Sequence, residues 1–397
     1  MSTSAVSTSA FTETEYYSLL INYAVENRFS VALWRLPDDS VTRLIISKSL
    51  HRLKFTDAIE DLETGFIFAP FDASADRIFL KADLVFSFSD GRLNRPATPL
   101  EISSDDWLSE RREEFKNISS GLYVIRSHDA ETTSKDFFSR LVGDAINDIE
   151  KGTFEKVVLS RTKIIERQPE LDIGVFFQKL CGIYKNALIS FVSTPETGSW
   201  LGASPELLVS VQDKRIFKTT ALAGTQAYSA GVNIKSVAWT QKDIEEQALV
   251  ERYIISCFKK IRLREYEEHG PRTVVAGNLI HLKSDFTVDM EATNFPRLGS
   301  VMLQLLHPTS AVCGVPLDTS LEFIHKRENY DRQYYSGYLG PINFLNRSDI
   351  FVNLRCLQIL EKKLTLYAGA GITQDSIPEK EWDETELKLN TLLKVIE

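Results

Sequence analysis

Strand-like segments follow one another with few intervening helical patterns in this chain of 397 residues. The apolar, β-branched segments that we expect to be strands cover residues 156–165, 188–193, 200–211, 215–222, 273–288, 334–344, 350–360 and 363–367. Consecutive strands pair in antiparallel sheets, whereas parallel strands need a crossover, usually a helix, between them. The order therefore predicts an α+β fold with large antiparallel sheets. No GxGxxG opens a helix after a strand and no GxxxxGK[S/T] occurs, so nothing supports a nucleotide-binding fold.

Helical periodicity is clearest at residues 135–151, where apolar residues recur every three or four positions. We expect further helices at residues 172–184, 239–261, 298–306, 319–328 and 379–395, flanking the sheets of a single domain. The first third contains shorter strand-like stretches at 30–36 and 65–69 and a charged, helix-like stretch at 105–116. It carries no motif of catalytic or binding residues. The polar segment 127–134 is the best candidate for a seam, that is, a boundary between this first third and the rest of the chain.

The chain is acidic, because 46 Lys and Arg stand against 55 Asp and Glu for a net charge of −9. Nucleic-acid binding needs a cationic surface, so we expect none, and an anionic substrate would need a local cationic pocket or a divalent metal ion. No apolar run approaches the ~20 residues that span a membrane, and residues 1–11 do not look like a secretory signal. The four cysteines lack CxxC or zinc spacing, which favours a reducing, cytoplasmic location.

A lysine and a glutamate stand in apolar surroundings at two places. Lys156 lies in FEKVVLSR (154–161), where burial of an ammonium group is costly without a partner. Such a lysine can act as a general base; the alternative is an exposed lysine on an edge strand. Glu206 lies between a Ser-Pro turn and an apolar strand, so burial would raise its pKa and make it a general acid. The alternative is an ordinary turn carboxylate.

Two of the expected helices each carry two acidic residues three positions apart. These pairs are Asp243 with Glu246 and Glu381 with Glu384, and the spacing places each pair on one helix face. Lys388 shares the face of Glu384, and an apolar stripe adjoins it. Hard oxygen ligands are typical of Mg²⁺ sites, so the two faces together are a candidate metal site. The alternative for each helix is a solvated Glu–Lys pair.

Glycines and an arginine near the C-terminus indicate an anion-binding site. Gly369 and Gly371 in YAGAGI (367–372) follow a strand and allow close approach of a ligand to the backbone, although a tight bend without a ligand has the same pattern. Arg355, in NLRC (353–356), lies in an apolar strand and needs an anionic partner. That partner is either a carboxylate side chain or a substrate carboxylate.

In this order, the motifs resemble those of the chorismate-utilising enzymes, and most closely those of the isochorismate synthases. The matching segments are FEKVVLSR (154–161), WLGASPELL (200–208), ALAGT (221–225), KDIEEQ (242–247), HPTSAVCGVP (307–316), YSG (335–337), NLRC (353–356), YAGAGI (367–372) and EWDETELKLNT (381–391). The resemblance divides the chain into a chorismate-binding catalytic core at residues 136–397 and a variable N-terminal part at residues 1–135.

The resemblance implies a reversible, Mg²⁺-dependent conversion of chorismate into isochorismate, in which water adds at ring carbon 2 and the hydroxyl group leaves carbon 4. It implies that Lys156 is the base and Glu206 the acid. Glu246 and Glu384 are implied to be the closest metal ligands, with Glu381 and Asp243 further from the ion. The residues implied to bind the substrate are Gly224, Thr225, His281, Tyr335, Arg355, Gly369, Gly371 and Lys388. For His281, a structural role is an equal alternative.

The residues at positions 156 and 223 distinguish relatives that use water as the nucleophile from relatives that use an amine. Amino-transferring relatives usually carry Gln at the position of Lys156, and the aminodeoxychorismate branch carries a nucleophilic lysine at the position of Ala223. The resemblance therefore implies water as the nucleophile, a monomer without an amidotransferase subunit, and a product that feeds menaquinone or siderophore synthesis. Two alternatives stay open: a salicylate synthase, which goes on to eliminate pyruvate, and a non-catalytic relative that only binds chorismate.

Overall fold

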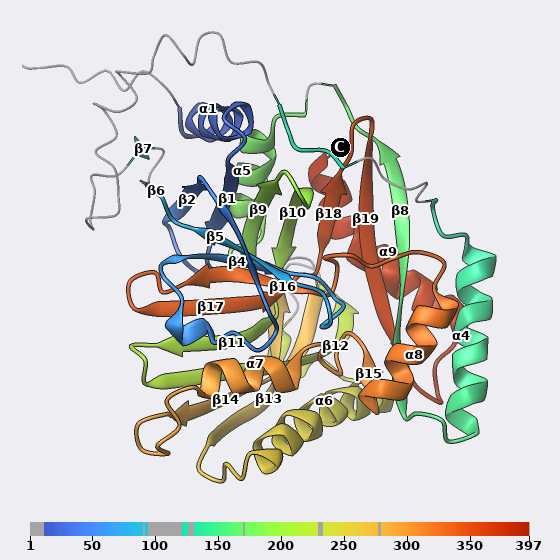
Figure 1. The fold of residues 1–397 in the computed structure, drawn as a ribbon. Helices are drawn as coiled ribbons and strands as arrows, with labels where there is room; N and C mark the ends of the chain where they lie inside the picture. Colours follow the sequence, from blue (N-terminus) through green and yellow to red (C-terminus); the bar gives the residue numbers. More distant parts are fainter. Residues whose placement is uncertain are drawn as a thin grey trace, which may run out of the picture.

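The computed structural model describes residues 12–89, 92–93, 121–125, 131–169, 171–228, 233–276 and 279–396. Within these residues the chain forms two large sheets with helices on their outer sides, and all the strand pairings are antiparallel (Figure 1). This confirms the predicted α+β class. The helix-like stretch at 105–116, the N-terminal residues 1–11 and residues 127–130 of the expected seam lie outside the described residues.

Each of the two sheets contains strands from both the N-terminal and the C-terminal part of the chain. The first sheet has the spatial order β15 (Gly314–Val315), β8 (Lys156–Glu166), β19 (Lys363–Ile372), β18 (Cys356–Ile359), β10 (Gly198–Ser204), β9 (Leu188–Thr194), β1 (Ser30–Arg35), β2 (Thr42–Ser47), β6 (Leu84–Ser89) and β7 (Arg92–Leu93). The second sheet has the order β13 (Glu267–Ala276), β14 (Leu279–Asp289), β12 (Ile216–Ala227), β11 (Leu207–Gln212), β17 (Arg347–Val352), β16 (Tyr338–Ile342), β4 (Gly65–Ala69), β5 (Arg77–Lys81) and β3 (Leu50–Leu53). Strands from the first third thus complete both sheets.

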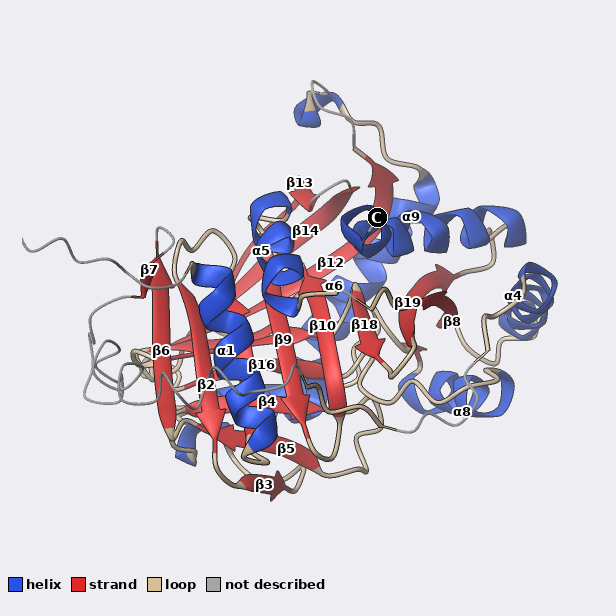
Figure 2. Ribbon diagram, turned by 90° about the horizontal axis from the view of Figure 1, so that it is seen from above, coloured by secondary structure: helices blue, strands red, loops and turns tan. Residues whose placement is uncertain are grey.

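Apolar side chains fill the space between the sheets. Trp34 of the first sheet belongs to one buried cluster with Phe66, Phe68, Leu339 and Phe351 of the second, and its ring contacts that of Phe66. Figure 2 shows the strands of one sheet running across those of the other. Such face-to-face packing buries one side of each sheet, so the outer sides need helices to cover them.

Helices cover the outer sides according to their apolar faces. The helices α1 (Glu13–Glu26), α5 (Ile173–Ile183) and α9 (Pro378–Ile396) lie on the first sheet, while α6 (Gln241–Lys260) and α7 (Leu298–Leu306) lie on the second. The helices α4 (Lys135–Glu150) and α8 (Leu317–Arg327) pack beside β8. In α5, the Asp172 side chain caps the N-terminus by accepting a hydrogen bond from the Val175 backbone N–H. No helix among the described residues is long and apolar enough to cross a membrane.

Two segments that the sequence predicts as single strands, 200–211 and 350–360, are each broken in the structure. The chain crosses from the first sheet to the second between β10 and β11, and it crosses back between β17 and β18. Pro205 cannot donate a ladder hydrogen bond, and Arg355 has a left-handed φ of 47°, so neither position continues a strand. The crossings are tied together, because Ala203 N donates to Arg355 O at 3.0 Å and Val352 N donates to Glu206 O at 3.0 Å.

A third prediction, a strand at 334–344, is also too long, because only Tyr338–Ile342 is a strand. Ser336 has a left-handed φ of 61°, and Gly337 N donates to Tyr334 O, so the chain turns before β16. The breaks have a common result. They place Glu206, Arg355 and Tyr335 near the ends of strands, close to where the chain passes between the two sheets.

Candidate active site

A cavity lies where β12, β14 and β19 meet the two crossings and the helices α6 and α9. Apolar and aromatic groups form much of its wall, including Leu222 and Tyr367. The sequence-predicted residues that line it are Glu206, Thr225, Glu246, His281, Tyr335, Arg355, Gly369, Gly371 and Lys388. A small set of polar groups that converge in an apolar cavity is typical of a small-molecule site.

Lys156 is the first residue of β8, and its side chain is fully buried. Its Nζ lies 2.9 Å from Oε1 of Glu246, which projects from α6. Glu246 lines the cavity, whereas Lys156 lies behind it. Burial acts to raise the pKa of Glu246, but the attraction of Lys156 and Lys242 outweighs it and lowers that pKa well below its usual range. The predicted base is therefore paired with a carboxylate in the cavity wall.

Glu206 lies in the crossing between β10 and β11 and is only 5% exposed. Burial raises its pKa to about 7, although Lys156 and Arg355 oppose part of that shift. Both the protonated and the ionised form are therefore accessible near neutral pH. This is the property that a general acid needs, and it agrees with the shift expected from the apolar flanks in the sequence.

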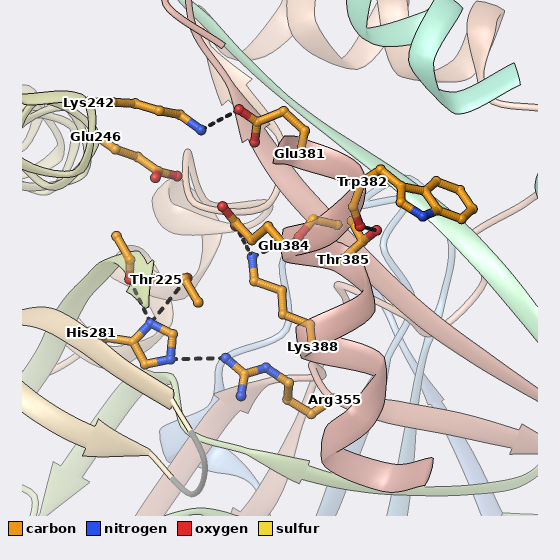
Figure 3. A network of polar contacts seen from close by, with 12 residues as sticks. Thr225, Lys242, Glu246, His281, Arg355, Glu381, Trp382, Glu384, Thr385 and Lys388 are labelled. Carbon is orange, nitrogen blue, oxygen red and sulfur yellow. Dashed lines mark hydrogen bonds and ion pairs between the residues drawn. The ribbon is translucent and has the colours of Figure 1, made fainter. Parts of the chain in front are cut away.

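His281 connects β12 to the arginine of the second crossing (Figure 3). Its Nδ1 lies 2.7 Å from Gly224 O, and its Nε2 lies 3.1 Å from Nη2 of Arg355. Because a guanidinium group only donates, Nε2 accepts and Nδ1–H donates to the carbonyl group. Burial and the charge of Arg355 lower the pKa of His281 to about 3, so the ring is neutral. His281 thus lines the cavity and also orients Arg355. Thr225 Oγ1 lies 3.4 Å from Nδ1.

Arg355 is buried and forms no ion pair with a carboxylate of the described residues. Burial lowers its pKa to about 10, which leaves it charged at neutral pH. Tyr335 and Gly369 lie nearby in the same wall, and a Cβ atom at Gly369 would lie 2.9 Å from the Tyr335 hydroxyl group. A buried cation without a protein anion is a binding point for an anionic group of a ligand.

Glu246 of α6 and Glu381 and Glu384 of α9 are directed at one another (Figure 3), but each of the three pairs with a lysine. Glu381 Oε1 lies 2.6 Å from Nζ of Lys242, and Glu384 Oε1 lies 2.7 Å from Nζ of Lys388. Lys388 also donates to Gly369 O at 2.8 Å. Among the described residues, no three acidic, His or Cys side chains converge as a preformed metal site.

Asp243 is in a different position from the other acidic residues. It is the third residue of α6, and its carboxylate accepts hydrogen bonds from the backbone and hydroxyl group of Thr240 in a capping box. It does not line the cavity, but its Cβ lies 3.3 Å from where a Cβ atom at Gly224 would be. The structure therefore shows a helix-capping role for Asp243, and its expected place near the metal stays a prediction.

Lys242 lies in the segment KDIEEQ (242–247), but no sequence pattern predicts a role for it. A cation in the first turn of a helix opposes the helix dipole, so such a lysine needs an anionic partner. That partner, Glu381, is 139 positions away and comes from α9. The unfavourable position of Lys242 was the available signal, but only the fold identifies its partner.

Gly371 provides a test of the Lys156–Glu246 pair. A Cβ atom there would clash with Oε1 of Glu246 and lie 2.9 Å from Cε of Lys156. The Glu246 side chain can move, so we expect Gly371→Ala to fold normally, break the pair and lower kcat/KM by about 10-fold or more, because small displacements of reacting groups are costly. Steady-state kinetics and thermal melting would measure both effects.

The control is Gly143→Ala in α4, where a Cβ atom meets nothing within 4 Å. It should leave kcat/KM unchanged. Wild-type kinetics for a folded Gly371→Ala protein would mean that the pair is not part of the reaction.

A buried lysine, a glutamate with a pKa near neutral pH, and a buried arginine without a carboxylate partner among the described residues are the groups that an acid–base enzyme for a small anionic substrate would need. The sequence profile of the family described as "Chorismate binding enzyme" matches residues 75–397. The chain belongs to this family, which confirms the resemblance found in the motifs.

The most similar relatives include isochorismate synthases. The chain is 28% identical over 330 residues to the vibriobactin-specific isochorismate synthase of Vibrio cholerae, covering 82% of this chain and 77% of that protein. It is 28% identical over 316 residues to isochorismate synthase EntC of Escherichia coli K12, covering 76% and 79%. The putative isochorismate synthase DhbC from Bacillus anthracis has a similar fold, with a TM-score of 0.72 at 22% identity over 96% of this chain and 99% of that one.

Proposed function

We propose that this protein is an isochorismate synthase that interconverts chorismate and isochorismate by adding water at ring carbon 2 and releasing the hydroxyl group from carbon 4. The observation that carries the proposal is one cavity wall that contains Glu206, with its raised pKa, the buried Arg355, and Glu246, which Lys156 pairs with from behind. The relatives named above carry the same activity in their names. Ala223, rather than a lysine, stands at the position that bears on the nucleophile.

The residues divide the chemistry among them. Arg355, held by the neutral His281, binds a carboxylate of the substrate together with Tyr335 and the backbone at Gly369. Glu206 gives a proton to the leaving hydroxyl group, and Lys156 takes a proton from the attacking water. A base must be neutral, whereas the ion pair with Glu246 stabilises the ammonium form. The Lys156–Glu246 pair must therefore open before the water is activated.

The carboxylates of α6 and α9 fit a bound Mg²⁺ ion. Oxygen ligands suit this ion, and Oε2 of the buried Glu381 has no hydrogen-bond partner among the described residues. Glu246 and Glu384 would hold the ion directly, and Glu381 would lie next to it. Bound Mg²⁺ supplies positive charge against the substrate carboxylate and the charge that develops in the reaction.

The direct test is to incubate the purified protein with chorismate and Mg²⁺ and to separate the products by chromatography. We expect isochorismate without pyruvate, the same final mixture from either pure isomer, and no reaction in EDTA. Pyruvate released together with salicylate would replace the proposal with a salicylate synthase. No conversion by a folded protein would indicate a relative that only binds chorismate.

A further inference from the structure

Lys242 lies among the carboxylates of Glu246, Glu381 and Glu384, which α6 and α9 direct at one another. Its Nζ is 2.6 Å from Oε1 of Glu381, and the carboxylates of Glu384 and Glu246 attract it as well. Figure 3 shows its side chain reaching from α6 toward α9, with Glu246 and Glu384 directed into the same space. The ammonium group thus lies where these carboxylates could share a cation.

We propose that Lys242 is a tethered cation that holds the divalent-cation site closed in the metal-free protein, and that it must leave Glu381 before a metal ion can bind. This inference rests on the Mg²⁺ site of the proposed function. It adds a competitor for that site, supplied by the chain itself.

The two partners differ in their ability to move. The side chain of Glu381 is 2% exposed, whereas that of Lys242 is 22% exposed and lies in the first turn of α6. A long lysine side chain can turn its charged end into water, but the carboxylate of Glu381 has no such route. The lysine is therefore the partner that leaves. The dipole of α6 does not hold it in place, because the N-terminus of a helix disfavours a cation.

The exchange also changes the charge at the site. In the metal-free structure, Lys156, Lys242 and Lys388 balance the charges of Glu246, Glu381 and Glu384 among the described residues. Replacing one ammonium group with a divalent cation adds one positive charge. That surplus favours an anionic substrate, so metal exchange would prepare the cavity for a carboxylate ligand.

The exchange can be measured without turnover, by titrating the whole protein with Mn²⁺ and recording the electron paramagnetic resonance signal of the free ion. If Lys242 occupies the site in about 90% of metal-free molecules, Lys242→Met should bind Mn²⁺ about tenfold more tightly than the wild type. Lys242→Arg, which keeps the charge, should bind no more tightly than the wild type. Displacement of Mn²⁺ by Mg²⁺ would relate the result to the proposed cofactor.

The matched control is Lys163→Met, because Lys163 also pairs with an α9 carboxylate, that of Glu386 at 3.2 Å, away from the site. Its Mn²⁺ affinity should equal that of the wild type. Equal or weaker Mn²⁺ binding by Lys242→Met would overturn the inference. Absence of Mn²⁺ binding in all of these proteins would overturn the metal site of the proposed function, and the inference with it.

Thermal melting gives a second readout. In EDTA, Lys242→Met should melt below the wild type, because Glu381 loses its partner in a buried position. Saturating Mn²⁺ should narrow that difference, since the ion replaces the missing charge. A difference of the same size with and without Mn²⁺ would show that Lys242 has only a structural role, and would also overturn the inference.

Discussion

Replacing Lys156 with glutamine should lower kcat in both directions by roughly 10²–10⁴-fold, the usual effect of losing a general base. Glutamine has a similar length and can donate a hydrogen bond to Glu246, but it cannot accept a proton from water. The Lys156 side chain is fully buried, and its Nζ lies 2.9 Å from Oε1 of Glu246. Initial rates from pure chorismate and pure isochorismate would measure the loss.

The matched control is Lys163→Gln, which changes a half-buried lysine in the same strand, away from the cavity. It should keep wild-type kinetics. Removing one partner of a buried pair also destabilises the fold, so the melting temperature of Lys156→Gln must be shown to exceed the assay temperature. A folded Lys156→Gln protein with near-normal turnover would remove Lys156 from the mechanism.

Elements with a strong local signal were predictable from the sequence. The helix expected at 135–151 is Lys135–Glu150 in the structure, because Phe138, Leu141, Val142 and Ala145 recur at helical spacing and are all buried. Alternation and composition likewise located most strands. The sheet to which each strand belongs could not be read, since that depends on pairing between distant segments.

The broken strands show why the sequence did not predict how the site residues are arranged in space. The apolar pattern continues through residues 200–211 and 350–360, so periodicity alone reads each segment as one strand. Glu206 and Arg355 lie at the breaks, where the chain passes between the sheets. Their chemical roles were inferred because charged residues in apolar segments need a reason. Their proximity, and the pairing of Lys156 with Glu246, required the fold.

Glu206→Gln tests the acid through the reverse reaction. Chorismate and isochorismate are both allylic alcohols of one ring, so their equilibrium constant is expected to be near unity and the enzyme must work in both directions. By microscopic reversibility, the acid of one direction is the base of the other. Glutamine can do neither, so initial rates from each pure isomer should fall by the same factor, roughly 10²–10⁴-fold, and the final mixture should not change.

The pH dependence identifies the group independently. The forward reaction starts from neutral Lys156 and protonated Glu206, and the reverse reaction starts from the ammonium and the carboxylate, so each needs one proton on the two groups together. Below the pKa of Glu206, at about 7, protonation of the carboxylate while Lys156 is an ammonium adds one proton too many. Wild-type kcat/KM should therefore fall about tenfold per pH unit below that value in both directions.

The residual activity of Glu206→Gln should lack this acidic limb, because glutamine does not titrate. Substrate carboxyl groups titrate at about pH 3–4 and do not contribute above pH 5. The control for an ordinary turn residue is Glu361→Gln, which changes an exposed carboxylate between β18 and β19. It should keep the wild-type rates and the fall of kcat/KM at acidic pH. If Glu206→Gln instead keeps wild-type rates and the same pH profile, Glu206 is itself a turn residue, and the acid must be another group in the cavity wall.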